Sequence, residues 1–216
     1  MSKTLDNPKI YHITHVNNLE SIIEDRYLWS DAQVHKRNFN KTQIGMSGIK
    51  RRRLEELEVG CNPGTKVGEY VPFYFCPRSI MLYMIYCGNH PELDYKKGQT
   101  LIVHLQCDLH KAVNWANRND IKWAFTTSNA GARFTEFFNN LSDLNQVNWE
   151  AVNSSDFRDS EIKDGKQAEF LMFDSFPWEL IEFIGVYSQS IKTKVDDVLL
   201  HACHRPAVSI RPQWYY

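Results

Sequence analysis

The sequence predicts one α+β domain over residues 1–216. Short strand-like and helical segments follow one another irregularly, without the repeated strand–helix–strand units of a parallel α/β fold. The 216 residues are 43% hydrophobic and include 6 Trp, 10 Tyr and 12 Phe. A chain of this length and composition buries a sizeable core, and it is not disordered.

The first part of the chain is expected to hold two strands and three helices. Apolar residues at helical spacing indicate helices, and runs of β-branched and aromatic residues indicate strands. In order, the expected elements are a strand at 10–14, a helix at 19–27 capped by Asn17 or Asn18, a polar loop at 31–43, a helix at 46–57, a turn-rich connection at 60–68, a strand at 70–75 and a helix at 79–87.

The remainder follows the same mixed pattern. Pro177 suits the first turn of a helix, because the missing N–H has no partner there in any case. The expected elements are strands at 100–106 and 121–126, a helix at 132–141, a charged loop at 154–167, a strand at 168–173, a helix at 177–183, and strands at 184–187 and 208–210 that flank a helix at 193–200.

Charge and cysteine content limit the possible classes of protein. The chain has 25 Lys and Arg against 26 Asp and Glu, so a nucleic-acid partner would need a local basic patch. The five cysteines are odd in number and never spaced CxxC, which favours a reducing cytoplasm and no zinc knuckle. His201, Cys203 and His204 lack a second ligand pair, and no metal is expected. No long apolar run or signal-peptide core is present, so no membrane contact is expected.

Common site motifs are missing. No GxGxxG follows a strand, and Gly60–Lys66 lacks the spacing of a phosphate-binding loop. GxSxG and HExxH are also absent. Function therefore has to be argued from less common arrangements.

The first such arrangement is a histidine and a hydroxyl on one strand. His12 and Thr14 are two residues apart, so both side chains project from the same face. Such a pair can bond a ribose or an amide. A half-exposed strand with no ligand is the alternative.

The second is the basic run 50–53, which precedes Glu55 and Glu56. Helical spacing places Arg51 and Arg52 beside these two acids as surface ion pairs. Arg53 instead lies between Ile49 and Leu57 on the apolar stripe. A guanidinium that faces inward needs an anionic or carbonyl partner, whereas one that snorkels to the surface does not.

The third is Glu169 at the mouth of an apolar strand. It faces the same side as Leu171 and Phe173 and directly follows a polar loop. This position suits a catalytic carboxylate, and protection of a sheet edge is the competing explanation.

Four blocks of residues show a resemblance to a known family. The chain resembles, nearly end to end, the DarT family of bacterial NAD-dependent DNA ADP-ribosyltransferases, the toxins of DarT–DarG toxin–antitoxin pairs. The blocks that carry the resemblance are Ile10-Tyr-His-Ile-Thr-His15, the segment 70–79 with Met81-Leu-Tyr83, Lys166-Gln-Ala-Glu-Phe-Leu171, and Trp214-Tyr-Tyr216.

The resemblance implies a fold and a cofactor site. The expected fold is that of ADP-ribosyltransferases, with two packed, curved sheets around an NAD cleft and helices outside. His12 and Thr14 would hold the nicotinamide ribose and the nicotinamide, and Tyr74 and Met81 would line that pocket. The NAD diphosphate would meet backbone N–H groups at the start of the helix capped by Asn18, and the segment 154–167 would position the acceptor.

The resemblance also implies a reaction. Glu169 would be the catalytic glutamate, which stabilises an oxocarbenium-like sugar and takes a proton from a thymine in single-stranded DNA. Arg53 would steady the resulting base anion, and Arg52, Arg78 and Arg133 are candidate DNA contacts. NAD is the co-substrate, and the implied partners are single-stranded DNA and a DarG-like macrodomain antitoxin.

Two other functions remain open at this point. One is an enzyme that modifies RNA on the same scaffold, either an RNA-directed ADP-ribosyltransferase or an RNA phosphotransferase. The other is a noncatalytic module that binds nucleic acid, although the presence of both Glu169 and His12 argues against it.

Overall fold

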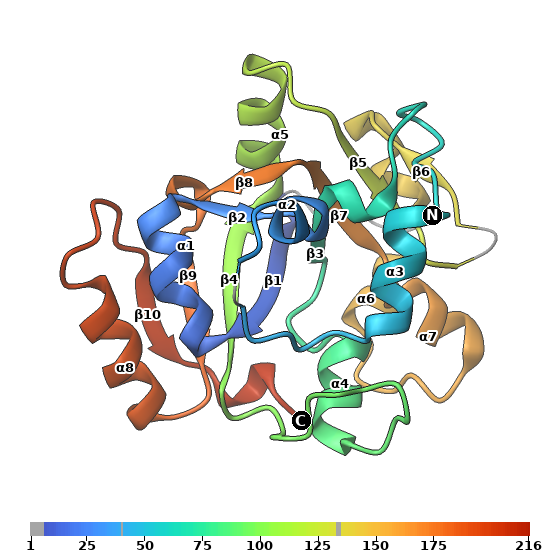
Figure 1. Cartoon of the computed structure of the whole chain (residues 1–216). Helices are drawn as coiled ribbons and strands as arrows, with labels where there is room; N and C mark the ends of the chain where they lie inside the picture. The colour runs from blue at the N-terminus through green and yellow to red at the C-terminus, as the bar shows by residue number, and fades with distance from the viewer. Residues whose placement is uncertain (1–6, 40, 133–134) are drawn as a thin grey trace.

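A large mixed sheet organises the molecule, as a computed structural model of residues 7–39, 41–132 and 135–216 shows (Figure 1). Its strand order is β10-β9-β4-β1-β3-β7-β5-β6, and a separate small sheet pairs β2 with β8. The strands are β1 Lys9–His15, β2 Tyr27–Trp29, β3 Tyr70–Tyr74, β4 Ile102–Asp108, β5 Trp123–Thr126, β6 Phe137–Phe138, β7 Glu169–Phe173, β8 Ser175–Pro177, β9 Phe183–Val186 and β10 Ala207–Ile210.

Helices surround the sheet (Figure 1), and several of them begin at a side-chain cap. Ser79 accepts a hydrogen bond from the N–H of Leu82 and so begins α4, and Gly88 at φ 63° ends it. The helices are α1 Leu19–Asp25, α2 Asp31–Lys36, α3 Ser47–Glu55, α4 Ile80–Cys87, α5 Leu109–Arg118, α6 Trp149–Asn153, α7 Ser160–Gly165 and α8 Gln189–Leu199. Short 3₁₀ turns occur at Val16–Asn18, Val67–Glu69, Leu141–Gln146, Trp178–Leu180 and Pro212–Trp214.

The register of the central strands determines which residues meet. β1 pairs antiparallel with β3 and β4, and Tyr11 lies opposite Tyr74. β7 lies between β3 and β5, with Glu169 opposite Tyr74. The start of β7 is therefore close to the middle of β1, where His12 and Thr14 lie.

The carboxyl-terminal segment packs into the fold beside α4 (Figure 1). The Tyr215 hydroxyl donates to the carbonyl of Ile102 at 2.8 Å. At Gly185, a Cβ atom would lie 2.3 Å from the ring of Trp214, so only glycine allows this close approach. These contacts fix the end of the chain against β4 and β9.

The α+β prediction is confirmed, with two sheets of unequal size and each of the expected strands present near its expected position. Several local predictions are wrong. The segment 31–43 contains α2, which Ser30 caps through the N–H of Gln33. The helix predicted at 19–27 ends at Asp25, because Arg26 adopts a left-handed φ of 61° and Tyr27 then pairs with Pro177.

The second half holds the other differences. No helix forms at 137–138 within the range 132–141, because Phe137 and Phe138 pair with β5. The segment 154–167 contains α7, capped by Asp159. The range 177–183 is the end of β8 and a 3₁₀ turn, not a helix, and the amphipathic helix α5 was not expected. For β6 and β8, strand pairing outweighs local helical propensity.

None of the helices in the described ranges is long and apolar enough to cross a bilayer.

The buried His104 should make stability depend on pH. Its ring donates from Nε2 to the carbonyl of Pro77 at 2.9 Å, and burial lowers the pKa of His104 from 6.5 to about 4. Below pH 6.5 the imidazole of His104 takes up a proton in the unfolded chain, whereas in the folded chain it stays neutral until the pH reaches about 4. We therefore expect the free energy of unfolding to fall by about 3 kcal/mol from this group as the pH drops from 7 towards 4.

Urea unfolding at several pH values measures this effect. In His104→Gln, which retains a side-chain N–H donor, the loss of stability with falling pH should be shallower. An identical slope in the two proteins would contradict the assignment.

Candidate active site

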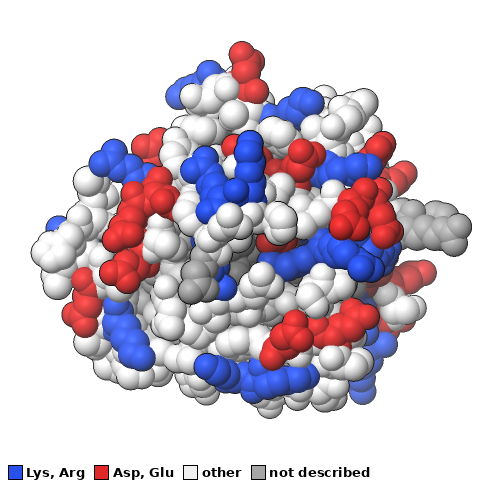
Figure 2. Space-filling view, in the orientation of Figure 1, with Lys and Arg blue, Asp and Glu red and all other residues white. Residues whose placement is uncertain are grey.

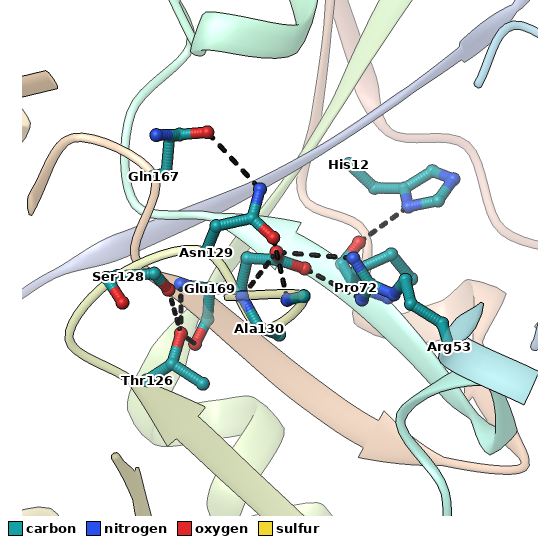
Figure 3. A network of polar contacts seen from close by, with 10 residues as sticks. His12, Arg53, Pro72, Thr126, Ser128, Asn129, Ala130, Gln167 and Glu169 are labelled. Carbon is teal, nitrogen blue, oxygen red and sulfur yellow. Dashed lines mark hydrogen bonds and ion pairs between the residues drawn. The ribbon is translucent and has the colours of Figure 1, made fainter. Parts of the chain in front are cut away.

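Glu169 begins β7 and is almost completely buried, with 1% of its surface exposed. Its backbone N–H donates to Oγ1 of Thr126 at 2.9 Å, and its carboxylate Oε1 accepts from the N–H of Ala130 at 3.1 Å. Both partners come from the end of β5 and the loop that follows it (Figure 3). The strand β7 therefore places the carboxylate, and this loop holds it.

Arg53 supplies the charge that makes the burial of Glu169 possible. From α3, Nη2 donates to Oε2 at 2.9 Å and Nη1 donates to Oε1 at 3.3 Å, and only 12% of the Arg53 side chain is exposed. Burial alone would lower the pKa of Arg53, but the carboxylate of Glu169 raises it. The guanidinium remains charged and forms a bidentate pair with the carboxylate.

The loop between β5 and β6 was missed by the sequence reasoning. Oγ1 of Thr126 donates to the carbonyl of Ser128 at 2.6 Å, and Nδ2 of Asn129 donates to Oε1 of Gln167 at 3.2 Å. The loop thus contacts both Gln167, which lies just before β7, and the carboxylate of Glu169. A run of small polar residues directly after a buried strand was the available signal, since such loops often carry function.

His12 lies on β1 with its protonation state fixed by its surroundings. Nδ1 donates to the carbonyl of Pro72 at 2.8 Å, and burial lowers the pKa of His12 to about 4. The imidazole is therefore neutral at pH 7, and Nε2 carries the lone pair. This nitrogen can accept a hydrogen bond from a ligand hydroxyl.

Asn18 has a different role from the one the sequence indicated. It stands at the N-cap of α1 but makes no capping bond. Its Nδ2 donates to Oγ1 of Thr14 and to the carbonyl of Thr42, both at 3.0 Å, and its Oδ1 accepts from the N–H of Thr42 at 2.9 Å. Asn18 therefore ties β1 to the segment that leads into α3.

A cavity of about 620 Å³ brings most of the predicted residues together. Glu169 does not itself line the cavity, but it is bonded to Arg53, which does. Figure 2 shows Lys and Arg side chains around the hollow in the middle of this face. The predicted residues that line the cavity are His12, Thr14, Asn18, Arg52, Arg53, Tyr74 and Met81.

Two predicted DNA contacts lie elsewhere. Arg78 does not line this cavity; its guanidinium carbon lies 4.3 Å from the ring centre of Tyr216. Arg133 lies outside the described residues. The segment with His201, Cys203 and His204 lines a second cavity, which α1 and α8 border, and no cluster of three or more metal-binding side chains occurs within the described ranges.

The sequence and structure of known proteins now decide the family. The DarT family, described as ssDNA thymidine ADP-ribosyltransferase, matches residues 11–216. This chain belongs to the DarT family. A DNA ADP-ribosyl transferase of Thermus sp. (strain 2.9) is 39% identical over 223 residues, with all of both chains covered. One from Mycobacterium tuberculosis is 26% identical and covers 96% of this chain and 88% of its own length.

Solved DarT structures share the fold. Thermus sp. 2.9 DarT in complex with ADP-ribosylated ssDNA superposes with a TM-score of 0.89 at 37% identity, and all of both chains is covered. The same protein in complex with NAD+ gives 0.82 at 36% identity, with 99% of this chain and 100% of that one covered. Thermosipho africanus DarTG in complex with ADP-ribose gives 0.75 at 18% identity, over 97% of this chain and 51% of that chain, a likeness of fold alone. The ADP-ribosyltransferase fold expected of a DarT protein is confirmed.

The buried pair of this DarT protein should be strongly coupled in stability. Replacement of one partner leaves the other as a buried charge without compensation. We expect Arg53→Met to lower the free energy of unfolding by about 3–5 kcal/mol, and the double variant Arg53→Met/Glu169→Gln to be more stable than Arg53→Met alone.

Urea unfolding of the two single variants and the double variant forms a complete cycle. Strictly additive losses would show that the pair is not a coupled unit.

Proposed function

We propose that this chain transfers ADP-ribose from NAD to a thymine of single-stranded DNA, with Glu169 and Arg53 as its catalytic residues. The reaction is that of the DarT family, to which the chain belongs. The observation that carries the residue assignment is the buried bidentate pair between Glu169 and Arg53, whose side chain lines a cavity of about 620 Å³.

The nicotinamide end of NAD fits beside β1 and α4. His12, neutral and with Nε2 as an acceptor, can receive a ribose hydroxyl, while Thr14 offers a hydroxyl on the same side of the strand. Tyr74 and Met81 line the same cavity and provide the apolar surface that a pyridine ring needs. This arrangement supports binding of NAD without a glycine-rich loop.

Basic side chains that line the cavity suit the binding of the NAD diphosphate better than the N-terminus of α1 does. Asn18 does not cap that helix, and α1 has only seven residues. Lys41, Lys50 and Arg52 line the cavity and supply the positive charge that a diphosphate needs.

Glu169 acts on the sugar. Cleavage of the bond between the nicotinamide nitrogen and the anomeric carbon leaves positive charge on that carbon and on the ring oxygen. A carboxylate that accepts a hydrogen bond from the ribose hydroxyl stabilises this charge as it develops. The bonding electrons leave with nicotinamide, and the sugar carbon is open to attack.

Arg53 acts on the incoming base. The ring nitrogen of thymine attacks the sugar carbon after Glu169 takes its proton, and the carboxylic acid formed then releases that proton to solvent. The negative charge then spreads over the neighbouring carbonyl oxygens of the thymine. The guanidinium of Arg53, already 2.9 Å from Glu169, can steady that charge while the new bond to carbon forms.

The biological setting follows from this chemistry. Modification of DNA bases blocks the template, so we propose that the protein acts as a toxin with a DarG-like macrodomain antitoxin that removes the mark. NAD and DNA meet in the cytoplasm, where we place the protein.

Mass spectrometry of an oligonucleotide tests the proposed reaction. A mixed-sequence single-stranded DNA incubated with the protein and NAD should gain one ADP-ribose, and fragmentation should locate it on thymine. A matched RNA serves as the comparison. Modification of RNA alone, or of neither, would overturn the proposal.

Removal of the carboxylate should nearly abolish transfer. We expect Glu169→Gln, which keeps the size and can still bond the N–H of Ala130 as an acceptor, to lower the rate of transfer by about 10²–10⁴-fold. Nicotinamide release and the mass of the DNA product are the measurements. Wild-type rates in a folded variant would exclude Glu169 from catalysis.

Loosening the loop at 41–46 should weaken NAD binding. Asn18→Ala removes the three hydrogen bonds that join this side chain to Thr14 and Thr42, so we expect a higher KM for NAD and a smaller change in the KM for DNA. Asn17→Ala, at an exposed neighbouring position, is the control. A KM for NAD equal to that of the wild type would show that this tie does not shape the site.

A further inference from the structure

A cluster of aromatic side chains lies on the side of α4 that faces away from the cavity. Tyr83 and Tyr86 are 38% and 53% exposed. The rings of Phe157 and Tyr216 lie 5.1 Å from the ring of Tyr83, and Tyr86 stacks on Tyr216 at 6.2 Å. We call Tyr83, Tyr86, Phe157 and Tyr216 the aromatic patch.

The patch is connected to the catalytic cavity by the elements that form it. Met81 and Met84 of α4 line the cavity, while Tyr83 and Tyr86 point from the opposite side of the same helix. Phe157 comes three residues before α7, which contributes Lys163 to the cavity wall. The patch and the cavity thus flank one helix.

Positive charge is present at both ends of α4. The guanidinium of Arg78 lies over the ring of Tyr216, and its Nε has no hydrogen-bond partner within the described part of the chain. At the other end, Nζ of Lys96 donates to the carbonyls of Gly88 and His90. The nearby carboxylate of Asp156 is neutralised by Arg158, at 2.5 Å.

Exposed aromatic rings between cations are the arrangement by which proteins bind single-stranded nucleic acid, with bases stacked on the rings and phosphates near the cations. We propose that the aromatic patch is a second DNA subsite, on which a base of the same single strand stacks while the target thymine occupies the cavity. This inference rests on the proposed function and names where the rest of the strand binds.

The distance across the helix indicates which base is bound. An α-helix with its side chains is about 10 Å across, so the stacked base belongs to a nucleotide about two or three positions from the target. Arg78, which was predicted to contact DNA and does not line the cavity, then has a phosphate within its range.

Steady-state kinetics with a series of variants tests the subsite. Tyr86→Ala should raise the KM for single-stranded DNA about 10-fold, leave the KM for NAD unchanged and leave nicotinamide release without DNA unchanged. Tyr86→Phe keeps the ring and should behave as the wild type. Tyr187→Ala is the matched control, because Tyr187 is also 38% exposed but lies outside the patch.

A second variant and a modified DNA show whether a change in the KM for DNA comes from the patch or from misfolding of Tyr86→Ala. Phe157→Leu keeps an apolar side chain and should also raise the KM for DNA. For the wild-type protein, one abasic position near the target should raise the KM for DNA. With this abasic oligonucleotide, Tyr86→Ala and the wild type should have the same KM for DNA.

The outcomes separate the two proposals. If the wild type modifies DNA and both variants keep its KM for DNA, the subsite is wrong and the proposed function stands. The subsite is also wrong if Tyr86→Ala raises the KM for NAD as much as the KM for DNA. It is wrong as well if the abasic oligonucleotide raises the KM of Tyr86→Ala by the same factor as it raises the KM of the wild type. If the wild type modifies no DNA, the proposed function itself fails.

Discussion

The bidentate pair between Arg53 and Glu169 is the constraint on which the rest of the site depends. A carboxylate that is 1% exposed is tolerated only with a partner that is charged and correctly oriented. Both carboxylate oxygens accept hydrogen bonds, Oε2 from Arg53 and Oε1 from Arg53 and the N–H of Ala130. The contact from Nη1 to Oε1, at 3.3 Å, is longer than that from Nη2 to Oε2, at 2.9 Å.

The strand order of the sheet brings this pair to the cavity that His12 and Thr14 line. β3 lies between β1 and β7 and pairs with both, so Tyr74 joins the strand of His12 to the strand of Glu169. Two loops complete the site from outside the sheet. The loop after β5 holds the carboxylate, and the segment 41–46, tied to Asn18 through Thr42, lines the cavity.

The sequence predicts those parts of the site that depend on local periodicity. Alternation along β1 places His12 and Thr14 together, and helical spacing turns Arg53 inward between Ile49 and Leu57. It could not show that Ala130 holds Glu169, because that bond comes from a backbone N–H 39 residues away. For the same reason the sequence predicted that Asn18 caps a helix, whereas its side chain bonds Thr42, which is 24 residues further along the chain. The strand β6 depends on pairing with β5, which local patterns do not record, whereas the caps Ser30 and Asp159 that begin α2 and α7 are local signals in the sequence.

The most direct test of this account is the division of ADP-ribose between DNA and water in Arg53→Lys. If Glu169 serves the sugar and Arg53 serves the base, this variant should still release nicotinamide from NAD by hydrolysis, while the fraction of ADP-ribose delivered to thymine falls sharply. Equal losses of hydrolysis and DNA transfer would contradict the separate roles assigned to the two residues.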